Sequence, residues 1–136
     1  EVGWSPTHPF ASSLTGASAA DLAAGYTSAT GKQWTQPIGF VHALFEMAAD
    51  VMGRVEDSRD PDEVTSAIAA TQLSSMVGRI AFDGAGLPPF AAANVAKTPL
   101  VGGQWRLKDG GGYDLVIVDN SDHPNIPTSG AMEEIS

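Results

Sequence analysis

Apolar residues recur at helical spacing after Pro37 and predict the clearest element of the chain. One helix face is formed by Val41, Leu44, Phe45, Ala48, Val51, Met52 and Val55, which follow the i, i+3, i+4, i+7 pattern. Pro37 suits the first turn of a helix. Asp50, Arg54 and Glu56 fall mainly on or beside the other face. We therefore expect an amphipathic helix that begins at Pro37.

Capping residues predict two further helices. Ser18 is followed three residues later by Asp21, which is close to a capping box. Gly31 stands where a helix end needs a left-handed residue. Asp60 and Pro61 fit the N-cap and the first position of a third helix, and both residue types favour those positions.

The second half of the chain changes from helical to strand-like patterning. A short strand is expected over 77–82, and two longer strands over 100–107 and 113–118. The connection 108–112 carries three glycines, which fits a hairpin loop. The segment from residue 120 onward is rich in Pro, Gly, Ser and acids and is expected to be irregular. Because a two-stranded hairpin is marginal alone, we expect something outside this chain to cover its faces.

Composition narrows the function classes. The 136 residues contain 43% hydrophobic and 17% charged residues, which is typical of one globular domain. A net charge of −9 from 16 acidic and 7 basic residues argues against nucleic acid and anionic membranes. The chain has no cysteine, so disulfides, thiolate nucleophiles and Cys-bound zinc are excluded.

Catalytic and metal-binding patterns are not found in the sequence. His8, His42 and His123 have no ligand spacing between them, and no G-x-S-x-G elbow occurs. The Gly-rich turns lack the Lys-Ser/Thr pair of a phosphate loop. We expect no enzyme, no metal site and no cofactor. The enzyme alternative would need His8 to meet Asp83 or Asp119 in space.

The N-terminal segment holds the candidate binding residues. Trp4, His8, Pro9 and Phe10 are bulky groups in a stretch without helical periodicity, and irregular segments often contact ligands. Aromatic walls with a few polar donors suit small-molecule clefts. The alternative is that these rings pack on the helices, which is the favoured interpretation for Phe10. Both interpretations stay open for Trp4.

Several short segments, in order, resemble the late part of type I periplasmic binding proteins of the branched-chain amino acid group. The segments are 4–10, 14–16, 30–34, 39–46, 77–82, 94–105 and 125–127. Each segment is short, and the resemblance rests on their order and spacing over nearly the whole chain. The family comprises the substrate-binding subunits of ABC transporters.

The resemblance implies an α/β fold in which three chain crossings join two lobes and a solute is trapped as they close. This chain would be the C-terminal portion of such a protein, with three helices followed by a short strand and a β-hairpin. The implied parts are an inter-lobe crossing (1–6), helices of the first lobe (7–75), strands returning to the second lobe (76–119) and a C-terminal tail (120–136). The missing N-terminal portion of the same protein would be its first partner.

The resemblance also implies a function and a place. The protein would capture a small solute, an amino acid or a related carboxylate, and deliver it to the ABC transporter permease from the periplasm or a lipid-anchored surface position. Trp4 and His8 would contact the ligand. The start at Glu1 rather than Met fits a processed chain or a fragment, and an isolated fragment is expected to pair with another copy. The alternative is a ligand-sensing or interaction module that reuses the same fold.

Overall fold

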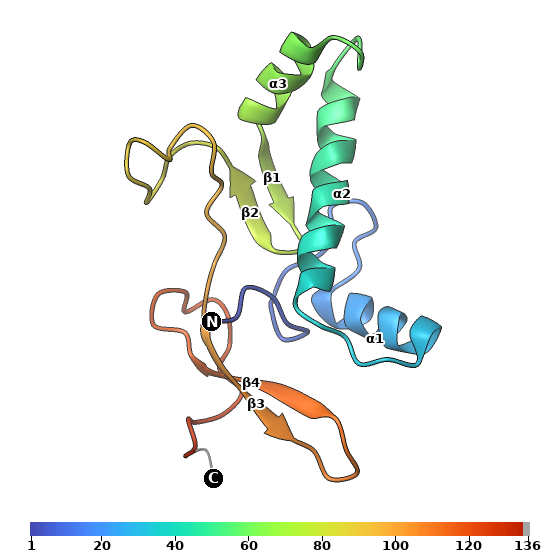
Figure 1. Cartoon of the computed structure of the whole chain (residues 1–136), viewed down its shortest axis with the longest axis vertical. Coiled ribbons are helices and arrows are strands. Elements are labelled where there is room, and N and C mark those ends of the chain that lie inside the picture. Colours follow the sequence, from blue (N-terminus) through green and yellow to red (C-terminus); the bar gives the residue numbers. More distant parts are fainter. Residues whose placement is uncertain (135–136) are drawn as a thin grey trace.

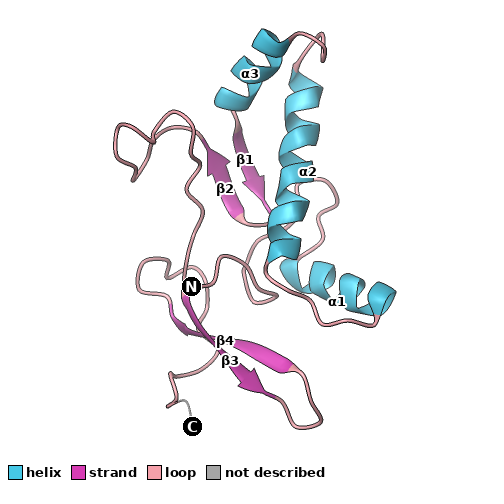
Figure 2. Ribbon diagram, viewed as in Figure 1, coloured by secondary structure: helices cyan, strands magenta, loops and turns pink. Residues whose placement is uncertain are grey.

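The computed structural model describes residues 1–134 and shows a mixed α/β chain with three helices and two small antiparallel sheets (Figure 1). The helices are α1 (Ala19–Thr30), α2 (Pro37–Arg54) and α3 (Pro61–Ala69), and the strands are β1 (Gln72–Ser75), β2 (Gly78–Ala81), β3 (Gly102–Leu107) and β4 (Tyr113–Asp119). Figure 2 shows α3 and the β1–β2 hairpin beside α2 at one end and β3–β4 at the other, with α1 at the end of α2 that is nearer to β3–β4. None of the helices described is both long and apolar enough to cross a bilayer.

The capping predictions are confirmed. The Ser18 hydroxyl accepts a hydrogen bond from the Asp21 N–H, and the Asp21 carboxylate accepts one from the Ser18 N–H, so the capping box is complete. Gly31 ends α1 in the left-handed conformation, with φ of 67°. The Asp60 carboxylate caps α3. These helix ends are therefore set by local side-chain chemistry.

The predicted lone strand over 77–82 belongs to a hairpin. The structure adds β1, a strand of sequence Gln-Leu-Ser-Ser that pairs in antiparallel register with β2. Sequence reasoning missed β1 because Leu73 is its only apolar residue, so the strand has no alternating pattern. The expected range 76–119 contains strands from both ends of the molecule.

The second hairpin and the tail form one unit. β3 and β4 pair from Gly102 to Asp119, with a register shift at the Gly102 end. The tail is irregular, as predicted, but it is held in place. Ile126 is fully buried, and the Ser129 N–H donates to the Ile117 carbonyl at 2.8 Å. Its one buried isoleucine therefore fixes the tail to the hairpin.

The buried apolar residues fall into two clusters joined by the N-terminal segment. The first is formed by Trp4, Ala19, Ala23, Ala43, Met76, Val77 and Ile80, and the second by Val2, Val101, Leu115, Ile117 and Ile126. Val2 pairs with Val101 through two backbone hydrogen bonds of 2.8 and 3.0 Å, and Trp4 is two residues further on. Trp34 packs against both clusters. Residues 1–6 thus pass from one core to the other.

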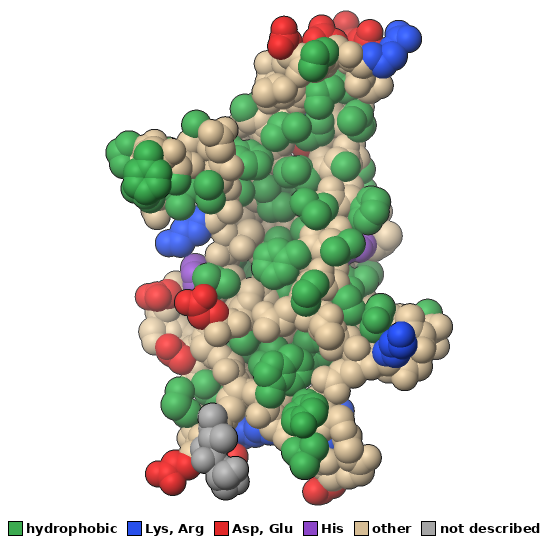
Figure 3. All heavy atoms as spheres, in the orientation of Figure 1, with side chains coloured by type: hydrophobic (Ala, Val, Ile, Leu, Met, Phe, Trp, Pro, Cys, Tyr) green, Lys and Arg blue, Asp and Glu red, His purple; other side chains and the backbone are tan. Residues whose placement is uncertain are grey.

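Most of the large apolar side chains of α2 are exposed to solvent. Val41, Leu44, Phe45 and Met52 are 51 to 67% exposed, and Figure 3 shows hydrophobic side chains at the surface along α2. The inner side of the helix instead carries the buried residues Gly39, Ala43, Glu46 and Val51. The predicted helix is confirmed, but most of its hydrophobic face lies in solvent. We define the outer face of α2 as Phe40, Val41, Leu44, Phe45, Ala48, Ala49 and Met52.

Candidate functional site

Trp4, the first predicted ligand contact, is a core residue. Its side chain is fully buried. The indole lies against Gly39 of α2, and its edge meets the Trp34 ring with the centroids 5.8 Å apart at 86°. This edge-to-face geometry is favourable between aromatic rings. The described residues cover the whole ring. A ligand role for Trp4 is not tested by this burial and stays a prediction.

His8, the second predicted contact, is also buried, with 3% of its surface exposed. Its Nδ1 lies 2.8 Å from the Ser5 hydroxyl, which is itself 2.8 Å from the Thr7 hydroxyl. The imidazole ring also packs against Phe10. Burial lowers the pKa of His8 to about 4, because the charged imidazolium loses hydration there. His8 is therefore neutral at physiological pH.

Two ring nitrogens of this segment are buried without a hydrogen-bond partner. They are the Trp4 Nε1 and the His8 Nε2. A buried polar group left unpaired costs about 1 to 3 kcal/mol, and such groups call for a specific explanation. A polar ligand or an ordered water would satisfy them. This is the feature of the segment that agrees with the predicted binding role.

The neutral His8 predicts a pH dependence of stability. Its pKa falls from 6.5 to about 4 on folding, so the unfolded chain binds more protons between these values. The contribution of the neutral His8 to the free energy of unfolding is therefore fully present above pH 6.5. It decreases towards pH 4, by at most about 3 kcal/mol. Urea unfolding of the wild type and His8→Gln at pH 7 and pH 5 checks this. We expect a smaller pH effect in the variant, and parallel losses would contradict the assignment.

A buried carboxylate anchors the loop before α1. Glu46 of α2 is fully buried. Its Oε1 accepts hydrogen bonds from the Ser13 N–H at 2.5 Å and the Ser13 hydroxyl at 2.9 Å, and its Oε2 accepts one from the Met76 N–H at 2.8 Å. One side chain therefore joins this loop, α2 and the β1–β2 turn. Three donors on one carboxylate satisfy its burial.

A serine–histidine pair lies one helical turn away from Glu46. The His42 Nε2 is 2.7 Å from the Ser12 hydroxyl. The same hydroxyl accepts hydrogen bonds from two backbone N–H groups of the following turn, and Ser12 is only 4% exposed. A nucleophile must reach its substrate. In this structure Ser12 is buried and the pair holds the loop in place.

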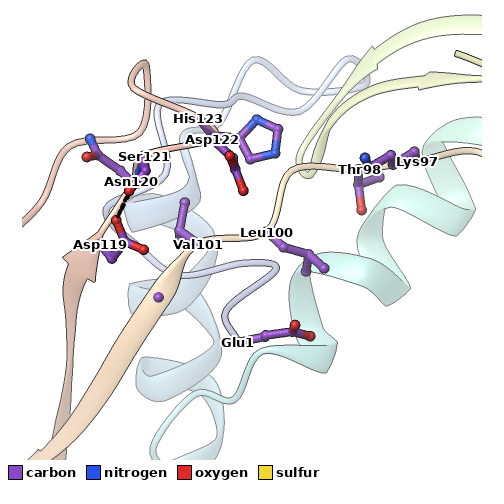
Figure 4. Close-up of a pocket in the computed structure, with 11 residues that line it drawn as sticks. Glu1, Lys97, Thr98, Leu100, Val101, Asp119, Asn120, Ser121, Asp122 and His123 are labelled. Atoms are coloured by element: carbon purple, nitrogen blue, oxygen red, sulfur yellow. Dashed lines mark hydrogen bonds between the residues drawn. The ribbon is translucent and has the colours of Figure 1, made fainter. Parts of the chain in front are cut away.

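A polar groove of about 640 Å³ lies beside the Val2–Val101 bridge. It is lined by Glu1, Lys97, Thr98, Leu100, Val101, Gly102, Asp119, Asn120, Ser121, Asp122 and His123. Figure 4 shows the turn after β4 on one side of the groove, with Glu1 and Lys97 on other sides. The groove is formed where residue 1, the segment 97–102 and the segment 119–123 meet.

Carboxylates dominate the charge of this groove. Glu1, Asp119 and Asp122 face a single Lys97. The Ser121 hydroxyl and then its backbone N–H lower the pKa of Asp119, so that carboxylate stays ionised. A groove of this charge suits an ammonium group and disfavours anions. Within residues 1–134, no cluster of His, Asp and Glu side chains is placed to hold a metal ion.

The sequence and the structure single out different residues. Trp4 lies in the first cluster and His8 is buried beside Phe10, and neither lines the polar groove. Sequence reasoning missed the buried Glu46 and the groove acids Asp119 and Asp122. The signal for Glu46 was a carboxylate between two apolar residues of a helix. The signal for the groove was an acid-rich turn directly after a strand.

No protein-family model matches the sequence, no curated protein matches it, and no solved structure matches the fold.

Proposed function

We propose that this chain is the C-terminal portion of the substrate-binding subunit of an ABC transporter, with a type I periplasmic binding protein fold. It would help to capture a small solute, an amino acid or a related carboxylate, when two lobes close. The proposal of this family rests on the order and spacing of the sequence segments that resemble it. The structural observation that supports it is the uncovered outer face of α2.

The outer face of α2 is close in size to the largest apolar patch that an isolated domain usually leaves open. Its large side chains are between 37 and 67% exposed. A full large side chain presents about 150 to 250 Å², so roughly 500 Å² of apolar side-chain surface is open here. This is near the upper end of the largest patch on a typical monomer, about 300 to 600 Å². The face is therefore suited to packing against a further apolar layer, which the N-terminal portion of a two-lobed protein would supply.

Two other features agree with a two-lobed protein. The hydrophobic residues form two clusters, and residues 1–6 connect them. The polar groove lies at this connection and carries three carboxylates. Since ligands of two-lobed proteins are held where the lobes meet, a carboxylate-lined groove at this point fits the ammonium group of an amino acid.

The experiment that tests the proposal is to determine the reading frame upstream of Glu1 and to express the complete protein. We expect a continuous frame that encodes an export signal and a further α/β lobe. Thermal unfolding of that protein should shift upward with one of the amino acids or small carboxylates in a screen. A start codon directly before Glu1 would overturn the proposal and favour a free-standing interaction module.

The outer face of α2 also predicts how this chain behaves alone. An uncovered apolar face of this size is expected to pair with a second copy. Sedimentation velocity over a range of concentrations should show a mass above that of the monomer. Phe45→Ser should weaken the pairing, because Phe45 is 67% exposed at the middle of the face.

Phe90→Ser provides the matched control for this experiment. Phe90 is 90% exposed but lies on the loop between β2 and β3 and is not part of the outer face of α2. Its loss should leave the association unchanged. A wild type that stays monomeric, or a Phe90→Ser variant that dissociates as much as Phe45→Ser, would contradict the assignment of the pairing surface.

A further inference from the structure

We propose that a groove between α1 and the β3–β4 loop binds small organic anions that carry a flat apolar body. The groove has a volume of about 720 Å³. One wall is the face of α1 that carries Ala20, Ala23, Ala24, Thr27 and Ser28, and the other wall is the Gly-rich loop at Gly111 and Gly112. The site is separate from the polar groove and does not depend on the proposed transport role.

The charge of this groove is opposite to that of the protein. The chain has a net charge of −9 and three lysines, and two of these, Lys32 and Lys108, line this groove. No acidic residue lines it. Lys32 makes no ion pair with any described residue, and Lys108 has one exposed partner, Asp114, at 3.4 Å. A local excess of positive charge in an acidic protein points to an anionic ligand.

The two walls are held in register by one side chain. The Gln33 Oε1 accepts a hydrogen bond from the Tyr113 N–H at 3.0 Å, which ties the segment after α1 to the start of β4. A Cβ on Gly112 would lie 3.3 Å from the same oxygen. The missing side chain at Gly112 therefore allows the close approach. The groove is built by contacts between distant segments and is not an accident of one loop.

An aromatic surface adjoins the lysines. Gln33 and Trp34 line this groove and also a second hollow of about 390 Å³, whose other walls are Thr35, Trp105 and Tyr113. The Trp34 and Trp105 rings are 5.7 Å apart at 35°. Trp105 and Tyr113 are 43% and 52% exposed, so their rings are open to a ligand. Aromatic side chains with an open face pack well on flat apolar groups.

These features together define the ligand. An anionic group would lie between Lys32 and Lys108, with help from the Thr27 and Ser28 hydroxyls that line the same groove. The flat body would lie on Trp34 and Trp105. Aromatic carboxylates have this shape and charge, and benzoate is the simplest probe.

The test is a titration of the ¹⁵N-labelled chain with benzoate, followed through the indole N–H signals. The chain has three tryptophans, so each signal can be assigned by one substitution. We expect Trp34 and Trp105 to shift and the buried Trp4 to stay in place. Acetate and inorganic phosphate should bind at least about tenfold more weakly than benzoate, because they lack the flat body. Phosphate binding as tightly as benzoate would overturn the proposed ligand class.

The variants Lys32→Gln and Lys108→Gln should each weaken benzoate binding, and together by about tenfold or more, because charge-assisted contacts are lost. Both lysines are exposed, so their loss should not unfold the chain. Lys97→Gln is the matched control, since Lys97 is the third lysine and lines the polar groove instead. Equal weakening in all three variants, or no shift of the indole signals in the wild type, would overturn the site. The reading frame upstream of Glu1 has no bearing on these outcomes.

Discussion

Replacing Glu46 with alanine should cost about 3 to 5 kcal/mol of unfolding free energy. The carboxylate is fully buried and accepts three hydrogen bonds, from two groups of Ser13 and from the Met76 N–H. The alanine leaves the buried Met76 N–H without a partner, and such a group costs about 1 to 3 kcal/mol. It also removes the acceptor that ties down Ser13, an exposed residue. The lost side chain also leaves a cavity. Urea unfolding at pH 7 measures the difference from the wild type.

Two further variants separate the causes of this loss. Ser13→Ala removes only the hydroxyl donor, so it should cost about 1 kcal/mol. Glu56→Ala removes an exposed carboxylate just beyond the end of α2 and should stay within about 0.5 kcal/mol of the wild type. If Glu46→Ala lost no more stability than Glu56→Ala, Glu46 would not be the anchor of the loop.

The parts of the fold that depend on neighbouring residues could be predicted from the sequence. Ser18 and Asp21 satisfy each other within one turn, and Asp60 caps the helix that follows it directly. The glycine-containing β3–β4 hairpin was also predicted, because its strands are long and its loop is short. Such elements need no information from distant parts of the chain.

The direction in which α2 faces could not be predicted in this way. Periodicity shows which residues share a face, but it does not show what that face meets. Trp4, which packs on Gly39, lies 35 positions earlier in the sequence. Because this ring occupies the small-residue side of the helix, the larger apolar side is left outside. The small residues Gly39 and Ala43, four positions apart, were the available sign of a close contact.

The candidate sites likewise depend on contacts between residues that are distant in the sequence. Bulky rings in an irregular segment predict Trp4 and His8 as binding residues, and the structure places both in the interior. The two grooves could not be found in the sequence, because each is lined by segments far apart. Lys32 and Lys108 are 76 positions apart, and their segments meet through the Gln33–Tyr113 hydrogen bond and the Trp34–Trp105 contact.

The packing of Trp4 on α2 should make the two glycines of that helix respond in opposite ways to alanine. Gly39→Ala should lose about 3 kcal/mol or more. Its Cβ would lie 2.2 to 2.5 Å from three atoms of the Trp4 ring. That ring is fully buried and packs edge-on against Trp34, so it cannot move away without disturbing the first cluster. Overpacking of a dense core typically costs about 1 to 3 kcal/mol, and a rigid neighbour raises the cost.

Gly53→Ala is the control within the same helix. A Cβ at Gly53 meets no atom within 4 Å, and the residue is exposed near the C-terminal end of α2. Alanine there should stabilise the chain by about 0.5 to 1 kcal/mol, because glycine is the weaker helix former. Chemical unfolding of both variants at pH 7 measures the two signs. If both variants gained stability, the Trp4 ring would not lie on α2, and the uncovered outer face of the helix would need another explanation.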